Sequence, residues 1–337
     1  MRSGILIVDK PQGVTSHDLV AAVRARLGMR RVGHAGTLDP MATGALIVGF
    51  GQATRLLNAI VGHDKTYEAT IRLGQATDTD DADGEPLPAE PGAEELLSEL
   101  TRQGVEAVIK EHYTGDIEQV PNVYSAIKVD GKRAYDLARA GQDVKLKARP
   151  VTISEFELLS YEPTRAADGA AVIDCRARVS CSSGTYIRAL ARDLGRELGV
   201  GGHLTALRRT RVGRFDLADP DMRARALTAR VGERTYTDRQ GQIRIRKRAD
   251  LDQDRLELHR RALSLAEGAK LAMPTQPVSP KQAQELQHGR FVDLTLSGPT
   301  AALLAPTDGC EERLVAILEP YGVGRAKPRA VFTLDEG

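Results

Sequence analysis

Tryptophan is absent from the 337-residue sequence, which also has few phenylalanines (five) and few cysteines (three). The cysteines, Cys175, Cys181 and Cys310, form no CxxC pair and have no zinc-site spacing, so the sequence favours a reducing cytoplasm. No apolar run approaches the roughly 20 residues of a membrane span, and the run from Ile5 to Val8 is too short for a signal peptide. With 41% hydrophobic and 28% charged residues, we expect a soluble globular protein, and its length suggests about two domains.

The net charge of +1 hides a strong internal asymmetry. Residues 77–118 contain thirteen Asp or Glu and two Lys or Arg, whereas residues 176–214 contain nine Arg and two acids. Residues 223–248 again hold nine Lys or Arg against two acids. Basic stretches this dense indicate either a polyanion partner, such as the phosphates of a nucleic acid, or solvated surface, and composition alone does not decide between them.

Hydrophobic periodicity predicts an α+β (mixed α/β) fold in which strands alternate with helices and hairpins. One helix is expected to begin at Thr15 or Ser16 and to end at Gly28, with Leu19, Val23 and Leu27 on its buried face. Further strands are expected at 4–9, 45–50, 67–73 and 172–181, and further helices at 94–110 and 186–198. Residues 77–93 should form an acidic loop, and residues 120–150 a Pro-led turn, a hairpin at Val129–Lys132 and a short helix at 134–140. Residues 219–275 are expected to be mostly helical or irregular, and the chain from Val278 to be a small β domain.

The densest candidate for chemistry is the loop of residues 33–44, which contains His34, Asp39 and Pro40. Its glycines allow close approach of the backbone to a ligand, and Pro40 restricts Asp39 to extended conformations. Asp39 can therefore be a nucleophile, a general base or a metal ligand. The alternative is an Asp that orders its own loop, and for an isolated Asp-Pro that alternative is favoured.

Other sources of chemistry are disfavoured by spacing. The seven histidines form no HxxH or HxxxH pair, which argues against a metal. There is no GxxxxGK[ST] phosphate loop, no complete dinucleotide fingerprint and no serine nucleophile elbow.

Three further segments combine basic, aromatic and glycine residues. Residues 182–188 lie between an alternating strand and an amphipathic helix, and Arg188 in the first helical turn is expected to have an acidic partner because a cation there opposes the helix dipole. Tyr186 lies beside it. Tyr67 begins a strand with its ring inward, which on its own indicates a core tyrosine. Residues 207–213 read as a basic strand or loop.

Together these segments are far more specific than any one of them. GHAGTLDPMATGAL followed by KTYEATIRLGQATDTDDADGE resembles the TruB family of pseudouridine synthases, and SSGTYIRALARDLG and LRRTRVGRF follow in the family's order. The resemblance covers residues 4–216 and extends weakly to a PUA-type RNA-binding domain at 276–337. It implies a pseudouridine synthase fold with a central, largely antiparallel mixed sheet flanked by helices. Residues 1–275 would be the catalytic domain, in which 120–150 form a thumb-like RNA-contact segment and 217–275 have no assigned role.

The resemblance also implies roles for individual residues. Asp39 matches the catalytic aspartate, and Tyr67 the tyrosine that stacks on the target base. Tyr186 and Arg188 match the residues that flank the aspartate, with Arg188 as its ion-pair partner. Leu207 matches the apolar residue that lines the uracil pocket.

His34 matches the histidine that fills the space left by the extruded base, and Lys10 and Pro11 match a structural turn beside the site. Because flipping a base out of its stack costs a few kcal/mol, we expect phosphate contacts to offset that cost. The candidates for these contacts are Arg176, Arg178, Arg208, Arg209 and Arg211.

The function that the resemblance implies is isomerisation of uridine to pseudouridine in the T loop of tRNA, at position 55, by a cytoplasmic and monomeric enzyme. Neither a metal nor a nucleotide cofactor is expected, because the base is detached at N1 and reattached through C5 with no hydride or phosphate transfer. The partner is the T-arm stem-loop of tRNA, and help with tRNA folding is a second expected task. Two alternatives stay open: a non-catalytic RNA-binding or RNA-folding protein on the same scaffold, and an enzyme that acts on free nucleosides or sugars.

Overall fold

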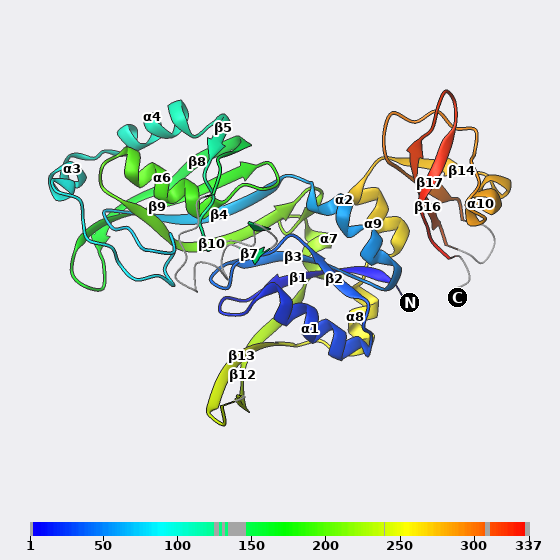
Figure 1. The fold of residues 1–337 in the computed structure, drawn as a ribbon, viewed down its shortest axis with the longest axis horizontal. Helices are drawn as coiled ribbons and strands as arrows, with labels where there is room; N and C mark the ends of the chain where they lie inside the picture. The colour runs from blue at the N-terminus through cyan, green and yellow to red at the C-terminus, as the bar shows by residue number, and fades with distance from the viewer. Residues whose placement is uncertain are drawn as a thin grey trace. The chain divides into compact units, whose positions relative to one another are not determined.

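The structure is a computed structural model that describes residues 3–124, 128–129, 132–133, 146–238, 240–306 and 311–333. The chain divides into two compact units (Figure 1). The first unit comprises residues 1–40, 44–63 and 211–337, and the second comprises residues 41–43 and 64–210. The part of the chain that is described contains no helix long and apolar enough to cross a membrane.

The first unit is built on a sheet in which strands distant in sequence are neighbours. Strand β1 (Gly4–Lys10) pairs antiparallel with β3 (Thr43–Phe50), and β1 pairs in parallel with the start of β12 (Leu227–Thr237). A short strand, β2 (Val32–Ala35), also pairs with β3, and β13 (Ile243–Leu251) pairs with β12. β1 and β3 are buried almost throughout, as their continuous apolar sequence predicts.

Helix α1 (Ser16–Leu27) confirms the prediction from caps and periodicity. The Thr15 side chain accepts from the Asp18 N–H while the Asp18 carboxylate accepts from the Thr15 N–H, so both ends of a capping box are present. Gly28 ends the helix in the left-handed region with φ +66°. The buried stripe is Leu19, Val20, Val23 and Leu27.

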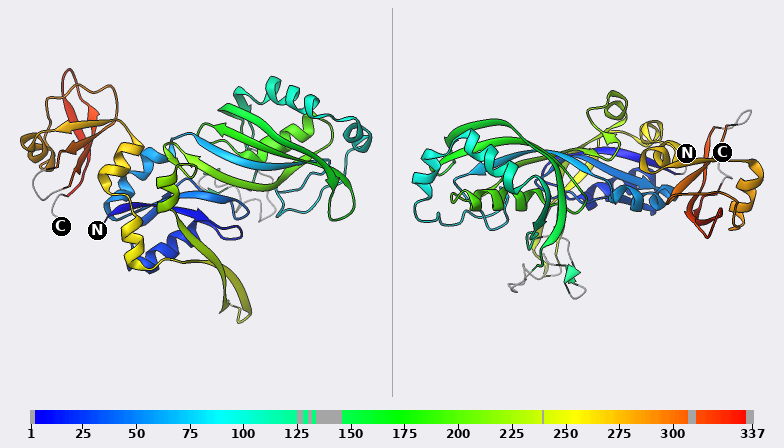
Figure 2. Two further views of the ribbon diagram at one scale, coloured as in Figure 1. Left: turned by 180° about the vertical axis from the view of Figure 1, so that it is seen from behind. Right: turned by 90° about the horizontal axis from the view of Figure 1, so that it is seen from above.

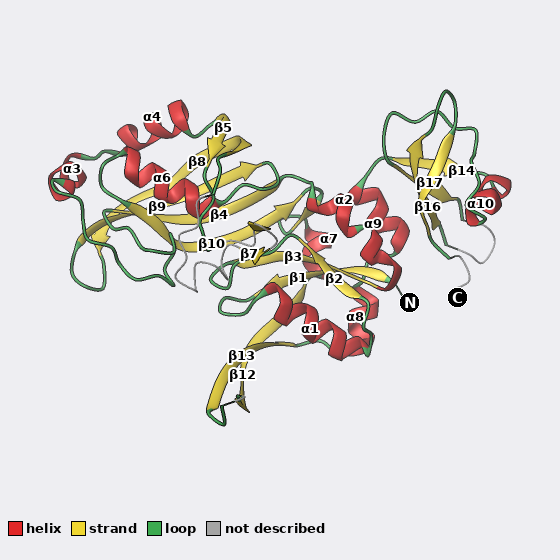
Figure 3. Cartoon of the chain, in the orientation of Figure 1, coloured by secondary structure: helices red, strands yellow, loops and turns green. Residues whose placement is uncertain are grey.

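Short elements complete the first unit around this sheet (Figure 3). They are the 3₁₀ helix η1 (Gly51–Arg55), α2 (Leu57–Val61), β11 (Phe215–Asp216), α7 (Pro220–Arg225), α8 (Arg255–Arg261) and α9 (Leu265–Ala272). The expectation that residues 219–275 are mostly helical or irregular is wrong, because β12 and β13 together supply twenty residues of strand. Their sequence is rich in Arg and has no continuous apolar face, so the usual strand pattern is weak.

The end of the chain forms a separate four-stranded sheet. Its order is β14 (Thr275–Val278), β15 (Thr300–Leu304), β16 (Arg313–Pro320) and β17 (Ala326–Val331), and helix α10 (Pro280–Gln287) accompanies it. The apolar runs at 301–304 and 314–318 lie in β15 and β16, as the sequence predicts. Its assignment as a PUA-type domain stays a prediction.

The second unit contains a sheet of five strands in the order β10 (Gly202–Val212), β4 (Lys65–Leu73), β9 (Ala171–Cys181), β8 (Arg149–Arg165) and β5 (Gly115–Gln119). β4, β9, β8 and β5 pair antiparallel, in line with the largely antiparallel sheet that was expected. Helix α6 (Ile187–Glu197) follows β9, and its apolar stripe is buried as predicted. Figure 2 shows these elements from two further sides.

The predicted helix at 94–110 is two helices, α3 (Ala93–Glu99) and α4 (Arg102–His112). The break occurs because Leu100 and Thr101 are extended and the Thr101 hydroxyl caps α4 by accepting from the Gly104 N–H. Farther along, β6 (Lys128–Val129) and β7 (Lys132–Arg133) pair as the hairpin signal predicts. The helix expected at 134–140 lies outside the described residues.

Candidate active site

The candidate site residues are divided between the two units. Asp39, His34, Lys10, Pro11 and Arg211 belong to the first unit. The second unit holds the others, which are Tyr67, Arg176, Arg178, Tyr186, Arg188, Leu207, Arg208 and Arg209.

The half-buried Asp39 follows a residue whose backbone is fixed to helix α1. The Leu38 N–H donates to Ser16 Oγ at 2.9 Å, and the Ser16 hydroxyl lies 3.1 Å from the Leu38 carbonyl oxygen. Gly36 enters this turn with φ +86°, a conformation that a side chain would strain. The backbone immediately before Asp39 is therefore held in place by helix α1.

On its other side, Asp39 is followed by an equally fixed residue. The Pro40 carbonyl oxygen accepts from the Gly13 N–H at 2.7 Å and from the Lys10 ammonium at 3.1 Å. Lys10 is fully buried, and its ammonium also donates to the Pro11 carbonyl at 3.0 Å. A buried charge is tolerated only when its donors are satisfied, so Lys10 ties the end of β1 to the Asp39 loop. This geometry accounts for the structural role expected of Lys10 and Pro11.

His34 lies on β2, where it is half-buried. Its ring meets the ring of His17 edge to face, with 5.4 Å between centroids. This contact links β2 to the first turn of α1.

In the second unit, Arg188 has the acidic partner that its place in the first turn of α6 predicts. Its Nη1 lies 3.2 Å from Asp81 Oδ2, and both side chains are buried. The guanidinium also donates to the carbonyl oxygens of Thr79 and Tyr124, each at 3.0 Å. Asp81 comes from the acidic run, which the sequence indicates to be a loop, so its burial was not predicted.

A second arginine of α6 repeats this arrangement one turn later. Arg192 Nη1 lies 3.1 Å from Asp80 Oδ2, and Arg192 Nη2 donates to the Val120 carbonyl at 2.8 Å. Asp80 also accepts from the Asn122 amide and has φ +60°, a conformation that is uncommon outside glycine. Sequence reasoning missed these residues, because adjacent acids in a Gly- and Pro-rich stretch usually indicate a solvated loop.

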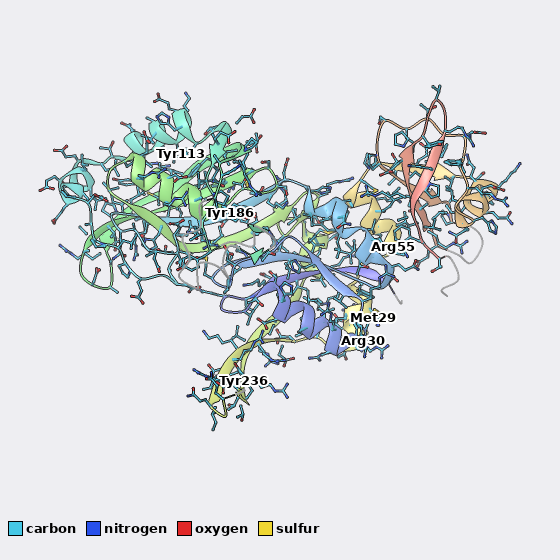
Figure 4. The ribbon with its side chains drawn as sticks, in the orientation of Figure 1. Met29, Arg30, Arg55, Tyr113, Tyr186 and Tyr236 are labelled. Atoms are coloured by element: carbon cyan, nitrogen blue, oxygen red, sulfur yellow. The ribbon has the colours of Figure 1, made fainter. Side chains whose placement is uncertain are left out.

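The start of α6 is fixed by a side chain from β5. The Tyr186 N–H donates to Gln119 Oε1 at 2.8 Å, and Gln119 Nε2 donates back to the Tyr186 carbonyl at 3.1 Å. Figure 4 shows Tyr186 at this end of the helix. Gln119 is almost fully buried, so this pair of bonds sets the entry of the chain into α6. The segment 119–124 is thus attached to α6 at Tyr186, Arg188 and Arg192.

The remaining predicted residues lie on strands of the second unit. Tyr67 on β4 is buried opposite Val179 of β9, and Leu207 on β10 is buried with its carbonyl accepting from Thr43 Oγ1 at 3.4 Å. Arg176 is exposed and Arg178 is half-buried on β9, where they pair with Glu68 at 3.9 Å and with Glu157 at 3.0 Å.

Arg209 departs from its expected role as a phosphate contact. The period of two along β10 places Arg209 on the same buried face as Leu207, and its exposed fraction is 1%. Lys65 of the adjacent strand is buried as well. Its burial is the main cause, and the nearby charge of Arg209 the second cause, that lower the pKa of Lys65 to about 8. A guanidinium this deep cannot reach a phosphate on the surface, so Arg209 is a structural cation, whereas Arg208 and Arg211 are half-buried.

In the described part of the chain, no group of three or more His, Cys, Asp or Glu side chains is placed to hold a metal ion. Cys175 and Cys181 are buried thiols, and burial raises the pKa of the Cys175 thiol to about 12. Both features point away from thiolate chemistry at these positions.

Comparison of the sequence with known proteins points to one family. Residues 24–187 match the model of the TruB family pseudouridylate synthase N-terminal domain, and residues 188–240 match the model of the tRNA pseudouridylate synthase B C-terminal domain. The tRNA pseudouridine synthase B of Bifidobacterium longum (strain DJO10A) is 50% identical over 98% of both chains. That of Thermobifida fusca (strain YX) is 47% identical over 98% of this chain and 99% of its own.

Solved structures agree at the level of the fold. The structure of an H/ACA RNP bound to a substrate RNA containing 2′-deoxyuridine includes a chain with a TM-score of 0.64 and 20% identity, which covers 98% of this chain and 85% of its own. A Cbf5-Nop10-Gar1 complex gives 0.64 and 23%, with 98% and 84% covered. On the sequence matches, the chain belongs to the TruB family of pseudouridylate synthases.

The first prediction concerns Asp80. Burial raises the pKa of its carboxyl above the ordinary 3.8, more than Asn122 and Arg192 lower it. A raised pKa means that the folded state holds a proton that the unfolded state has released, so wild-type stability falls as pH rises from 3.8 through the folded pKa. Asp80→Asn removes this titration and suits φ +60°, so its melting temperature should rise relative to wild type across that interval and then stay level.

Thermal melts of both proteins at closely spaced pH values between 3.5 and about 7 check this. Asp83→Asn, which neutralises an exposed acid of the same run, is the matched control and should show no such trend. A relative melting temperature of Asp80→Asn that falls with pH would mean that the ion pair with Arg192 outweighs burial.

The second prediction concerns Asp81. Asp81→Asn breaks a buried ion pair of Arg188, which should destabilise the fold by about 3 kcal/mol. Chemical denaturation measures this, with Asp78→Asn, an exposed member of the same run, as control. A loss below about 0.5 kcal/mol, the size of a surface substitution, would show that the other interactions of Arg188 suffice to hold it.

Proposed function

We propose that this protein isomerises uridine to pseudouridine in tRNA, at position 55 of the T loop. The observation that carries the proposal is the carboxylate of Asp39 on a loop held at Leu38 and Pro40, in a chain of the TruB family. Relatives named tRNA pseudouridine synthase B share half of its residues over nearly the whole length of both proteins, which supports tRNA as the substrate.

The reaction requires one carboxylate in a fixed place. The glycosidic bond at N1 breaks, the uracil turns, and a new bond forms from C1′ to C5, while a proton leaves C5 and N1 gains one. Asp39 is the group that attacks the nucleoside or removes a proton from its sugar. A nucleophile or base works best when its position is set before the substrate arrives, and the fixed backbone on either side of Asp39 provides that.

Arg188, Tyr67 and Leu207 have supporting roles in this proposal. Arg188 keeps the Asp39 carboxylate ionised, because a neighbouring cation favours the charged form of an acid. The flat ring of Tyr67 stacks on the flipped base, and Leu207 gives the uracil an apolar wall. His34 fills the space in the RNA that the flipped base leaves, and Tyr186 flanks Asp39.

The RNA is held by cations that the fold leaves accessible. Arg208 and Arg211 are candidates for phosphate contacts, and Arg176 and Arg178 would first have to exchange their glutamate partners for phosphates. The T-arm stem-loop, a monomeric enzyme and a cytoplasmic location complete the proposal, and two buried cysteine thiols are consistent with a reducing compartment.

The third prediction tests the central residue. Asp39→Asn keeps the shape of the side chain but removes the ionisable oxygen, so pseudouridine formation should stop while tRNA affinity stays within about tenfold, ~1.4 kcal/mol. Mapping of pseudouridine in tRNA transcripts treated with the purified variant measures pseudouridine formation, and filter binding measures tRNA affinity. Asp9→Asn on β1 is a control for removal of a carboxylate from the same unit.

Turnover by Asp39→Asn above a small fraction of the wild-type rate would remove Asp39 from its role. A wild-type protein that binds tRNA but forms no pseudouridine would instead support the alternative of an RNA-binding or RNA-folding protein. The assay therefore separates an incorrect residue from an incorrect function.

The fourth prediction concerns Tyr67. Tyr67→Leu should be inactive and Tyr67→Phe impaired but folded, because the ring provides stacking and the hydroxyl can handle a proton. Single-turnover rates on tRNA, with a melting curve for each variant, measure this. Full activity of Tyr67→Phe would restrict Tyr67 to stacking, and full activity of Tyr67→Leu would exclude it from the pocket.

A further inference from the structure

Strands β12 and β13 form a two-stranded ribbon, residues 227–251, that leaves the first unit's sheet beside α1 (Figures 1 and 2). Its ladder is continuous from Ala229 opposite Leu251 to Thr237 opposite Ile243. Beyond its base, residues on both of its faces are exposed. A two-stranded ribbon without a packing partner is marginally stable in water, so this one is expected to gain from a bound partner.

The register sorts the side chains of the ribbon into two different faces. Because alternate residues of a strand share a face, one face carries a basic set, and the other carries mainly small, apolar and Thr side chains together with one opposed pair of charges, Glu233 and Lys247. The basic set, called here the Arg face, consists of Arg230, Arg234, Tyr236, Arg244, Arg246 and Arg248, together with Gly232 and Asp250. Every member of the Arg face is exposed.

The Arg face holds more positive charge than the protein neutralises. Arg234 lies directly opposite Arg246, and like charges at opposed positions destabilise a sheet. Arg246 has a carboxylate at 3.2 Å, that of Asp18 on α1. Arg234 and Arg248 have no ion pair within the described part of the chain. A bound anion beside Arg234 would reduce its repulsion with Arg246.

Two other arginines of the Arg face form ion pairs with aspartates that directly follow the two strands. Arg230 lies 2.6 Å from Asp252, and Arg244 lies 3.0 Å from Asp238. Asp250 is itself paired with Arg26 of α1, at 3.1 Å. These three acids are therefore engaged, and Glu233 lies on the opposite face of the ribbon, so the positive charge of Arg234 and Arg248 is left for a partner.

The opposite face indicates which kind of polyanion fits. At the base of the ribbon Ala229, Ala249 and Leu251 pack against the core under α1, while Ile243 and Ile245 farther out are 75% and 66% exposed. A membrane surface would take up basic and apolar groups together, from one side of the ribbon. Here the exposed isoleucines and the arginines point in opposite directions, which favours a partner that offers phosphates alone.

Dimensions favour a rigid stem over a flexible strand. Side chains on one face of a strand repeat about every 6.6 Å, so the four rows of the Arg face extend along roughly 20 Å of ribbon. The wide, shallow minor groove of a base-paired RNA and its flanking phosphates form such a surface. Tyr236, near the far end of the ribbon and 48% exposed, adds a flat ring that can contact a sugar or an unpaired base (Figure 4).

We propose that the Arg face of the β12–β13 ribbon binds the phosphate backbone of a base-paired stem of the RNA substrate. This inference rests on the proposed function for the identity of that RNA. It gives residues 227–251 a task in holding the substrate, separate from the chemistry at Asp39.

The test compares two double variants of the full-length protein. Arg234→Gln with Arg248→Gln removes the two arginines without an ion pair, and Ile243→Thr with Ile245→Thr alters the opposite face, nearer the far end of the ribbon. Dissociation constants for a tRNA transcript, for a fully paired RNA hairpin and for a single-stranded RNA of equal length are measured from 50 to 300 mM KCl. The kinetic constants for pseudouridine formation are measured on the same samples.

For the Arg variant we expect the slope of log K against log salt to fall by about 1.4–1.8 on the paired RNAs, the amount for two lost phosphate contacts. KM should rise at least fivefold with kcat within about twofold, as for loss of a phosphate contact that acts equally on all sequences. The Ile variant should match wild type. Arg234→Lys with Arg248→Lys keeps the charge and should retain most of the slope, which separates charge loss from a folding defect.

Three results would overturn the proposal. They are an unchanged slope in the Arg variant, an equal loss of RNA binding in the Ile variant, and Arg-dependent binding to vesicles of anionic phospholipid without any effect on RNA. A wild-type protein that forms no pseudouridine, but whose affinity for paired RNA depends on the Arg face, would refute the proposed function and leave the ribbon's role standing.

Discussion

The burial of cationic side chains is the constraint on which the second unit depends. The side chain of Arg188 is buried, so its guanidinium needs acceptors from the protein, and Nη1 and Nη2 meet them at Asp81, Thr79 and Tyr124. Those acceptors come from the acidic run and from the segment that precedes residue 125, two parts of the chain with few apolar residues of their own. One arginine of α6 thereby orders two loops, and Arg192 secures the same two through Asp80 and Val120.

In the first unit the buried cation is a lysine. Lys10 is buried at the end of β1, and the carbonyl oxygens of Pro11 and Pro40 satisfy part of its hydrogen-bonding capacity. Backbone carbonyls carry no net charge, so these two hydrogen bonds fix the loop without adding a charge beside Asp39.

Periodicity and caps predicted the elements whose local signals agree with their surroundings. Helix α1 has a capping box, an apolar stripe and a terminal glycine, and each was found where the sequence indicates. The predictions failed where polar residues are buried or where strands lack an apolar face. Asp80 and Asp81 lie in a run that reads as solvated loop, and their partners on α6 are more than 100 residues away, a distance over which sequence patterns carry no pairing information. The burial of Arg209 was not predicted for a related reason. The alternation of β10 places its side chain on the buried face, against the usual preference of arginine for the surface.

The β12–β13 ribbon shows why such failures are informative. A strand is recognised by the side chains that it buries, and most of this ribbon buries none, so only its backbone ladder and register reveal it. A segment that folds with exposed arginines on one face and exposed isoleucines on the other obtains little stability from the rest of the chain. Local disagreement between sequence pattern and structure of this kind tends to mark positions that serve a partner. The register, which composition cannot supply, is what turns a basic stretch into a directional surface.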